Sequence, residues 1–195
     1  MPAEDKPFIT VVSGLPRSGT SMMMRMLERG GIPVMTDGVR TADDDNPRGY
    51  YEFEPVKQLE WNTSWLADAY RKAIKIIYVF LYHLPAIHRY KVLFLRRSLN
   101  DVVASQKVML DRRRQAGTLT DEQLMESYNQ QLQRLYSWVK RQSNIEILYL
   151  DYEEILSEPE TAVFDITNFL GVPLNAQAMM QTIEPSLHRN RSTVI

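Results

Sequence analysis

The chain has 195 residues, a formal net charge of -1 and no cysteine. This length suits a single domain, expected over residues 1–195, with a sizeable buried core. The near-neutral charge argues against nucleic acid as a partner. The missing cysteines exclude a disulfide scaffold, a thiolate metal site and a cysteine nucleophile.

The N-terminal residues contain no basic stretch followed by an apolar core, which would indicate a secretory signal. The most apolar segment, residues 73–87, is interrupted by Lys75, His83 and Pro85, and it is too short to cross a bilayer. We therefore expect a cytoplasmic protein without a transmembrane segment.

Strands and helices alternate along the chain. Apolar and β-branched runs predict strands at residues 8–13, 73–80, 91–95 and 145–150. Amphipathic runs predict helices at residues 20–29, 54–69, 99–114, 120–142 and 159–170, and a long loop covers residues 36–51. Capping boxes are expected for Thr120 with Gln123 and for Ser157 with Glu160. This order predicts an α/β fold, a three-layer sandwich with a mainly parallel central sheet, in which ligands bind beyond the carboxyl ends of the strands.

The segment Gly14-Leu15-Pro16-Arg17-Ser18-Gly19-Thr20-Ser21 resembles the phosphate-binding loop G-x-x-x-x-G-K-[ST] between a strand and a helix. Successive backbone N–H groups and a helix N-terminus form a nest for an anion, and the Arg17 guanidinium suits phosphate or sulfate oxygens. Thr20 stands where that loop has lysine, which argues against ordinary ATP or GTP hydrolysis. A tight turn without a ligand is the alternative.

A second signature follows the strand at residues 91–95. Arg96 and Arg97 end this strand, and Ser105 lies eight positions after Arg97 on the next predicted helix. An arginine at a strand end and a hydroxyl on the following helix can converge on one phosphate. The spacing to Ser105 favours Arg97 over Arg96.

Together these segments resemble the sulfotransferases that use 3′-phosphoadenosine 5′-phosphosulfate. Residues 16–21 resemble that family's 5′-phosphosulfate loop, P-[KR]-S-G-T-[TS], and residues 97–105 resemble its 3′-phosphate motif. Residues 148–159 resemble the later Y-E-D-L…P segment, and residues 169–172 resemble the F-L-G that follows it. Ser98-Leu99 departs from the usual Asp-Pro or Asn-Pro, and the chain is short for the family.

The resemblance implies a fold like that of P-loop nucleoside triphosphate hydrolases. It also implies transfer of a sulfuryl group from the phosphosulfate donor to a hydroxyl or amine of a small-molecule or glycan acceptor. Arg97 and Ser105 would hold the 3′-phosphate, and Arg189 and Arg191 are further candidates for nucleotide contacts. The residues that would hold the phosphosulfate are Pro16, Arg17, Ser18, Gly19, Thr20 and Ser21. Of these, Arg17 would also stabilise the charge that develops on the leaving oxygen.

A hydroxyl acceptor needs a general base. Glu52, at the end of the long loop, is the first candidate, because several branches of the family use a carboxylate after the first helix. Asp37 is a second carboxylate candidate. His83 is a third, because His83-Leu84-Pro85 resembles the H-L-P of cytosolic sulfotransferases, although the lysine two residues before that histidine is replaced by Leu81. Lys75 is either a supporting cation or a charge that extends to the sheet edge.

No metal is expected, because a sulfuryl group carries less charge than a phosphoryl group and the sequence has no His-x-x-x-His pair or carboxylate cluster. Two other functions stay open. One is a nucleotide-dependent small-molecule kinase with a variant loop, and the other is a non-catalytic nucleotide-binding module that kept the anion-binding loop without a base.

Overall fold

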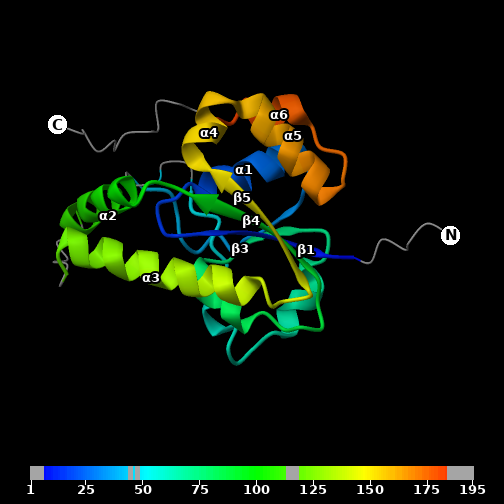
Figure 1. Ribbon diagram of the computed structural model, residues 1–195. Coiled ribbons are helices and arrows are strands. Elements are labelled where there is room, and N and C mark those ends of the chain that lie inside the picture. The colour runs from blue at the N-terminus through cyan, green and yellow to red at the C-terminus, as the bar shows by residue number, and fades with distance from the viewer. Residues whose placement is uncertain (1–6, 44–45, 47–48, 113–118, 184–195) are drawn as a thin grey trace.

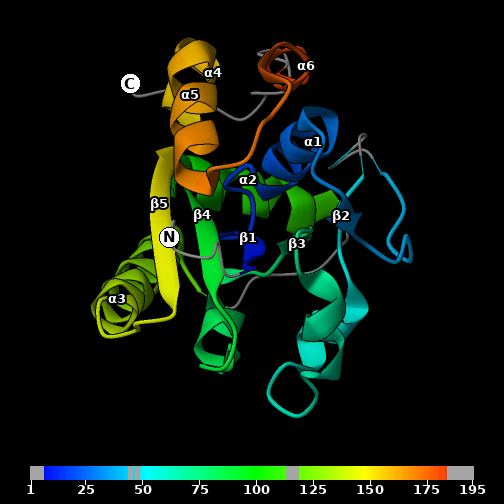
Figure 2. The same ribbon diagram turned by 90° about the vertical axis from the view of Figure 1, so that its right-hand side faces the viewer.

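The computed structural model describes residues 7–43, 46, 49–112 and 119–183. Arg189 and Arg191, which are predicted to contact the nucleotide, lie outside these residues. The central sheet contains five parallel strands in the order β2-β3-β1-β4-β5, seen side by side in Figure 2. The strands are β1 (Ile9–Gly14), β2 (Val34–Met35), β3 (Ala73–Lys75), β4 (Tyr90–Arg96) and β5 (Ile145–Asp151).

β1 lies at the centre of the sheet and is buried along its whole length, as is typical of a strand that is covered on both faces. It pairs with β4 on one side, where Val12 lies opposite Leu93, and with β3 on the other, where Val12 lies opposite Lys75. Because all five strands are parallel, their carboxyl ends meet at one edge of the sheet.

Helices cover both faces of the sheet (Figure 1). One face carries α1 (Thr20–Gly30), α4 (Tyr152–Ser157), α5 (Pro159–Leu170) and α6 (Ala176–Met180). The other carries α2 (Leu99–Arg112), α3 (Asp121–Val139) and the 3₁₀ helices η1 (Glu54–Gln58), η2 (Ser64–Ala69) and η3 (Tyr78–His83). The predicted three-layer α/β class with a mainly parallel sheet is confirmed.

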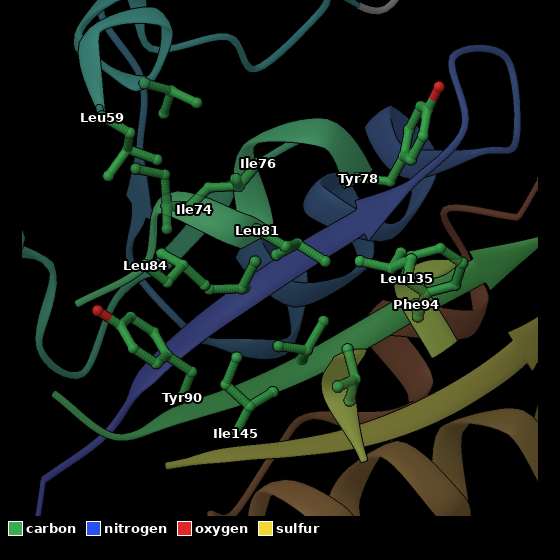
Figure 3. Close-up of a cluster of buried hydrophobic side chains, with 14 of the residues drawn as sticks. Leu59, Ile74, Ile76, Tyr78, Leu81, Leu84, Tyr90, Phe94, Leu135 and Ile145 are labelled. Carbon is green, nitrogen blue, oxygen red and sulfur yellow. The ribbon is translucent and has the colours of Figure 1, made fainter. Parts of the chain in front are cut away.

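Two apolar clusters hold these layers together. Under α1, the side chains of Met23, Met24 and Met26 are fully buried against the sheet. On the opposite face, a larger cluster joins the 3₁₀ helices, the sheet and α3, with Phe94 and Leu135 among its members (Figure 3). Burial of a large apolar side chain contributes about 1.5–3 kcal/mol to stability, so these clusters hold the helices firmly on both faces of the sheet.

The structure tests the two predicted capping boxes at helix N-termini. Thr120 Oγ1 accepts a hydrogen bond from the Gln123 backbone N–H, and Gln123 Oε1 accepts one from the Thr120 N–H, so the first predicted capping box is confirmed. The second is wrong. Ser157 is the last residue of α4, and its hydroxyl donates back to the Glu154 carbonyl oxygen. Among the described residues, no side chain caps α5, which begins at Pro159.

Two predicted elements between residues 54 and 80 are also wrong. The expected helix at 54–69 is divided into η1 and η2, because Asn62 Oδ1 accepts hydrogen bonds from the backbone N–H and the hydroxyl of Ser64 and forms a turn there. The expected strand at 73–80 ends at Lys75. The pairing of Val12 with Lys75 leaves only two more residues of β1 as partners, so the sheet cannot continue and η3 begins at Tyr78.

Candidate active site

The segment between β1 and α1 turns at the carboxyl edge of the sheet. Gly14 has a φ of 149°, and a Cβ there would lie 2.6 Å from the Leu95 carbonyl oxygen. Gly19 has a φ of 98°, and a Cβ there would lie 2.5 Å from the Tyr152 ring. Both positions therefore need glycine. No side chain of the described residues caps α1 behind Gly19, so the first N–H groups of the helix are left to bind an anion.

Arg17 connects this loop to α2. Its backbone is left-handed, with a φ of 71°, and its Nε donates a hydrogen bond to Ser105 Oγ at 2.9 Å. Its carbonyl oxygen accepts a hydrogen bond from an Arg97 terminal nitrogen at 3.0 Å. The structure thus brings together three residues that the sequence singles out for anion binding, from three separate segments of the chain.

The two arginines at the end of β4 differ in direction. The Arg96 side chain is nearly half exposed and forms an ion pair with Asp151 at 2.5 Å. The Arg97 side chain is only 8% exposed, and its Nε lies 3.9 Å from a carboxylate oxygen of Asp101 and 3.9 Å from one of Glu153. Arg97, the residue that the spacing favours, thus bonds the loop, whereas Arg96 pairs with Asp151.

Lys75, at the end of β3, reaches the start of α1. Its Nζ donates hydrogen bonds to the Tyr50 carbonyl oxygen at 2.6 Å and to Ser21 Oγ at 3.3 Å, and it lies 3.9 Å from Glu52 Oε1. The side chain is only 8% exposed. Burial lowers the pKa of Lys75 to about 8, the Glu52 charge opposes this change, and the nearby arginines reinforce it.

Sequence reasoning underrated Lys75, because its inward direction follows from the pairing of β3 with β1. The signal that could have found it is its position in an apolar segment that predicts a buried strand of the parallel sheet. A lysine there cannot extend to water along the sheet edge.

The two carboxylate candidates for the base lie in different environments. Glu52 is a quarter exposed, and its Oε1 accepts a hydrogen bond from Arg40 at 2.6 Å as well as facing Lys75. Asp37 instead accepts hydrogen bonds from the backbone N–H groups of Glu54 and Val39, and the bond from Glu54 is the main cause of the lowered pKa of Asp37. Glu52 therefore lies in the cluster around the loop, whereas Asp37 stabilises a turn.

His83 lies near the opposite edge of the sheet. The ring of its neighbour Tyr82 packs 4.9 Å from Trp138, near the end of α3, and the Pro85 carbonyl oxygen accepts a hydrogen bond from Tyr90, the first residue of β4. The structure does not bring His83 to the loop, because the polypeptide has returned to the amino ends of the strands. This placement argues against the expectation that His83 is the general base.

Within the described ranges, no three His, Asp or Glu side chains gather in a way that would hold a metal ion. No helix in that part of the chain is both long enough and apolar enough to cross a membrane.

Comparison with known proteins agrees with this geometry. The family model described as "Sulfotransferase domain" matches residues 9–192. STF1 from Mycobacterium tuberculosis H37Rv, a sulfotransferase, has a similar structure, with a TM-score of 0.60 and 16% identity over 91% of this chain and 71% of that chain. The sulfotransferase domain of the Synechococcus PCC 7002 olefin synthase has a TM-score of 0.54 and 14% identity, over 97% and 82% of the two chains.

Mouse sulfotransferase SULT7A1, whose structure is a complex with PAP, has a TM-score of 0.51 and 18% identity, over 95% of this chain and 66% of that chain. No curated protein matches the chain. The TM-scores show that the fold is shared, including its P-loop-like architecture, and at these identities they show the fold alone.

Proposed function

This chain belongs to the sulfotransferase family, and from that premise we propose that it uses 3′-phosphoadenosine 5′-phosphosulfate as the donor. The acceptor is a hydroxyl or amine of a small molecule or glycan, and the predicted cytoplasmic location belongs to the same proposal. The observation that carries the proposal is the meeting of Arg17, Arg97 and Ser105 beside the uncapped start of α1. A complex of a similarly folded sulfotransferase with PAP, adenosine 3′,5′-bisphosphate, supports the choice of donor.

The residues present fit a donor with two separate anionic ends. Gly14 and Gly19 leave no room for a Cβ, which would collide with Leu95 and Tyr152, so the tight turn of this loop depends on glycine. The backbone N–H groups up to Ser21 and the Arg17 guanidinium would hold the phosphosulfate end, and Arg97 with Ser105 would hold the 3′-phosphate. Arginine suits both ends because its planar donor fork matches tetrahedral oxyanions.

The donor supplies an activated sulfuryl group and a nucleotide as the leaving group. The acceptor oxygen or nitrogen forms a bond to sulfur while the bond from sulfur to the 5′-phosphate oxygen breaks, and the electron pair stays on the phosphate. Arg17 and Lys75 stabilise that developing negative charge, which is worth most in the transition state. With a pKa of about 8, Lys75 is mostly protonated at pH 7. Glu52 accepts the proton that the acceptor loses.

The experiment that tests this function measures transfer from the ³⁵S-labelled donor to a panel of phenols, sugars and amines. Arg17→Ala is expected to abolish transfer with the fold intact, and Glu52→Gln should lower kcat by about 10²–10⁴-fold with little change in PAP affinity. Arg89→Ala is the matched control, because Arg89 forms an exposed ion pair with Glu146 away from the loop.

Nucleotide binding separates this function from the two alternatives. A sulfotransferase binds PAP without magnesium, whereas a kinase with a variant loop binds ATP with magnesium. A protein that binds PAP but transfers no sulfuryl group to any acceptor would be the non-catalytic module. Transfer by Arg17→Ala at the wild-type rate would remove Arg17 from the site.

A further inference from the structure

Arg40, in the loop that leads to Glu52, is a cation that the phosphosulfate donor does not account for. One of its terminal nitrogens donates a hydrogen bond to Glu52 Oε1 at 2.6 Å. Its guanidinium carbon lies 3.3 Å from the centre of the Tyr50 ring, so the planar group is stacked on the aromatic face. The side chain is 31% exposed. The stacking and the ion pair fix the plane of the guanidinium while one side remains open to solvent.

The proposed base therefore sits between two cations. Glu52 Oε1 faces Arg40 at 2.6 Å and Lys75 at 3.9 Å. Lys75 belongs to the proposed phosphosulfate site, because it also donates a hydrogen bond to Ser21 in the anion-binding loop. Arg40 approaches the same oxygen from a different segment, residues 36–51. An acceptor group that gives its proton to Glu52 must consequently come close to Arg40.

The ion pair with Arg40 also restricts the base. A hydrogen bond to Glu52 Oε1 competes with the acceptor for that oxygen. An acceptor that carries an acid group would bind the exposed side of the guanidinium, which has five N–H donors, and would weaken its hold on Glu52. A neutral acceptor offers no such exchange, so Arg40 would hinder its reaction.

We propose that Arg40 recognises the acceptor, and that this acceptor carries an oxyacid group, such as a carboxylate or phosphate, near the hydroxyl or amine that is sulfated. The inference rests on the proposed sulfotransferase function and extends it to the substrate class. Tyr50 serves as the platform for the guanidinium, and its hydroxyl is itself anchored to Asp43 Oδ1 at 2.5 Å.

The test uses pairs of acceptors that differ only in charge. 4-Hydroxyphenylacetate is compared with its methyl ester, 3-hydroxybutyrate with its methyl ester, and glycerol 3-phosphate with glycerol. For at least one pair the wild-type protein should favour the acidic member in kcat/KM by about 10-fold or more, the scale of a charge-assisted hydrogen bond. The carboxylate and phosphate pairs identify which oxyacid is preferred.

Arg40→Ala should remove this preference by lowering kcat/KM for the acid and raising it for the neutral member, and Arg40→Lys should retain part of the preference. Arg89→Ala, which removes a comparable arginine–glutamate pair from another part of the surface, should leave it unchanged. Wild-type protein that turns over both members of every pair equally would overturn the proposal. A uniform loss of both members in Arg40→Ala would also overturn it, because Arg40 would then act only on Glu52.

PAP binding, measured by calorimetry, distinguishes failure of this inference from failure of the proposed function. Arg40→Ala should bind PAP with wild-type affinity. If PAP binds but no pair is turned over, each acid and ester is titrated into the PAP complex. Binding of an acid that depends on Arg40 supports the proposal, and its absence overturns it. Absence of both PAP binding and transfer would refute the sulfotransferase function itself.

Discussion

Replacement of Lys75 by methionine should separate activity from stability. Lys75 is buried at the end of β3, and its pKa falls from 10.5 to about 8, chiefly because burial disfavours the ammonium ion. A difference of this size corresponds to roughly 3 kcal/mol by which the charged lysine destabilises the folded state. Lys75→Met keeps most of the side-chain volume and removes the charge, so it should abolish sulfuryl transfer without unfolding the protein.

The lost hydrogen bonds offset part of this gain. Lys75 Nζ bonds the Tyr50 carbonyl oxygen and the Ser21 hydroxyl, and each bond contributes about 1 kcal/mol. The Tyr50 carbonyl oxygen keeps a second donor, the Ser21 hydroxyl at 3.2 Å, so it is not left without a partner. The variant should therefore be more stable than the wild type by about 1 kcal/mol at pH 7.

The difference should change sign with pH. Below the folded-state pKa of about 8, Lys75 is charged in both the folded and the unfolded state, and the destabilisation applies in full. Between pH 8 and 10.5 the folded protein releases this proton before the unfolded chain does, so wild-type stability rises relative to that of the variant. Wild type and Lys75→Met should be equally stable at about pH 9, and above that pH the wild type should be the more stable.

Urea unfolding of both proteins at pH 7, 8, 9 and 10 measures this difference, with Lys57→Met as the control because Lys57 is exposed. The control should show the same difference from wild type at every pH. A Lys75→Met protein that loses more than about 2 kcal/mol at pH 7 would refute the reasoning, because Lys75 would then be a stabilising residue. A difference that stays constant from pH 7 to 10 would refute the shifted pKa.

Three further outcomes test the rest of the site. Arg97→Ala should weaken PAP binding by about 1–3 kcal/mol in calorimetry, whereas Arg96→Ala should bind normally, and equal losses would contradict the different directions of the two side chains. Gly19→Ala should lower the free energy of unfolding by about 1–3 kcal/mol, because it forces a Cβ onto Tyr152 at a positive φ. His83→Ala should keep kcat within about twofold. A fall in kcat of about 10²-fold, as expected for loss of a general base, would instead show that His83 takes part in the reaction.

The features that sequence predicted correctly depend on short segments. Strand, glycine turn and helix around residues 14–21 follow from backbone requirements at Gly14 and Gly19, and the Thr120 cap depends on a residue three positions away. The choice of Arg97 over Arg96 for anion binding depends on its spacing to Ser105 and stays a prediction.

The features that sequence missed depend on contacts between distant segments or on small differences between neighbours. Lys75 is buried because β3 pairs with β1, and no pattern within β3 reveals that partner. The helix expected at residues 54–69 does not form as one element, because the Asn62 side chain accepts a backbone hydrogen bond that a helix would use. The periodicity of apolar residues does not reveal this competition. In the sequence, Asp37 and His83 are candidates for the general base like Glu52. The three differ in their surroundings, which only the fold reveals.

The distances between charges differ between the buried and the exposed cations at the carboxyl ends of the strands. The buried cations Lys75 and Arg97 each lie 3.9 Å from their carboxylates, whereas the exposed pair of Arg96 with Asp151 closes to 2.5 Å. A carboxylate near a buried cation offsets part of the cost of burying the positive charge. The parallel sheet allows this arrangement because the ends of β1, β3 and β4 meet at one edge, which brings charges from distant parts of the chain close together.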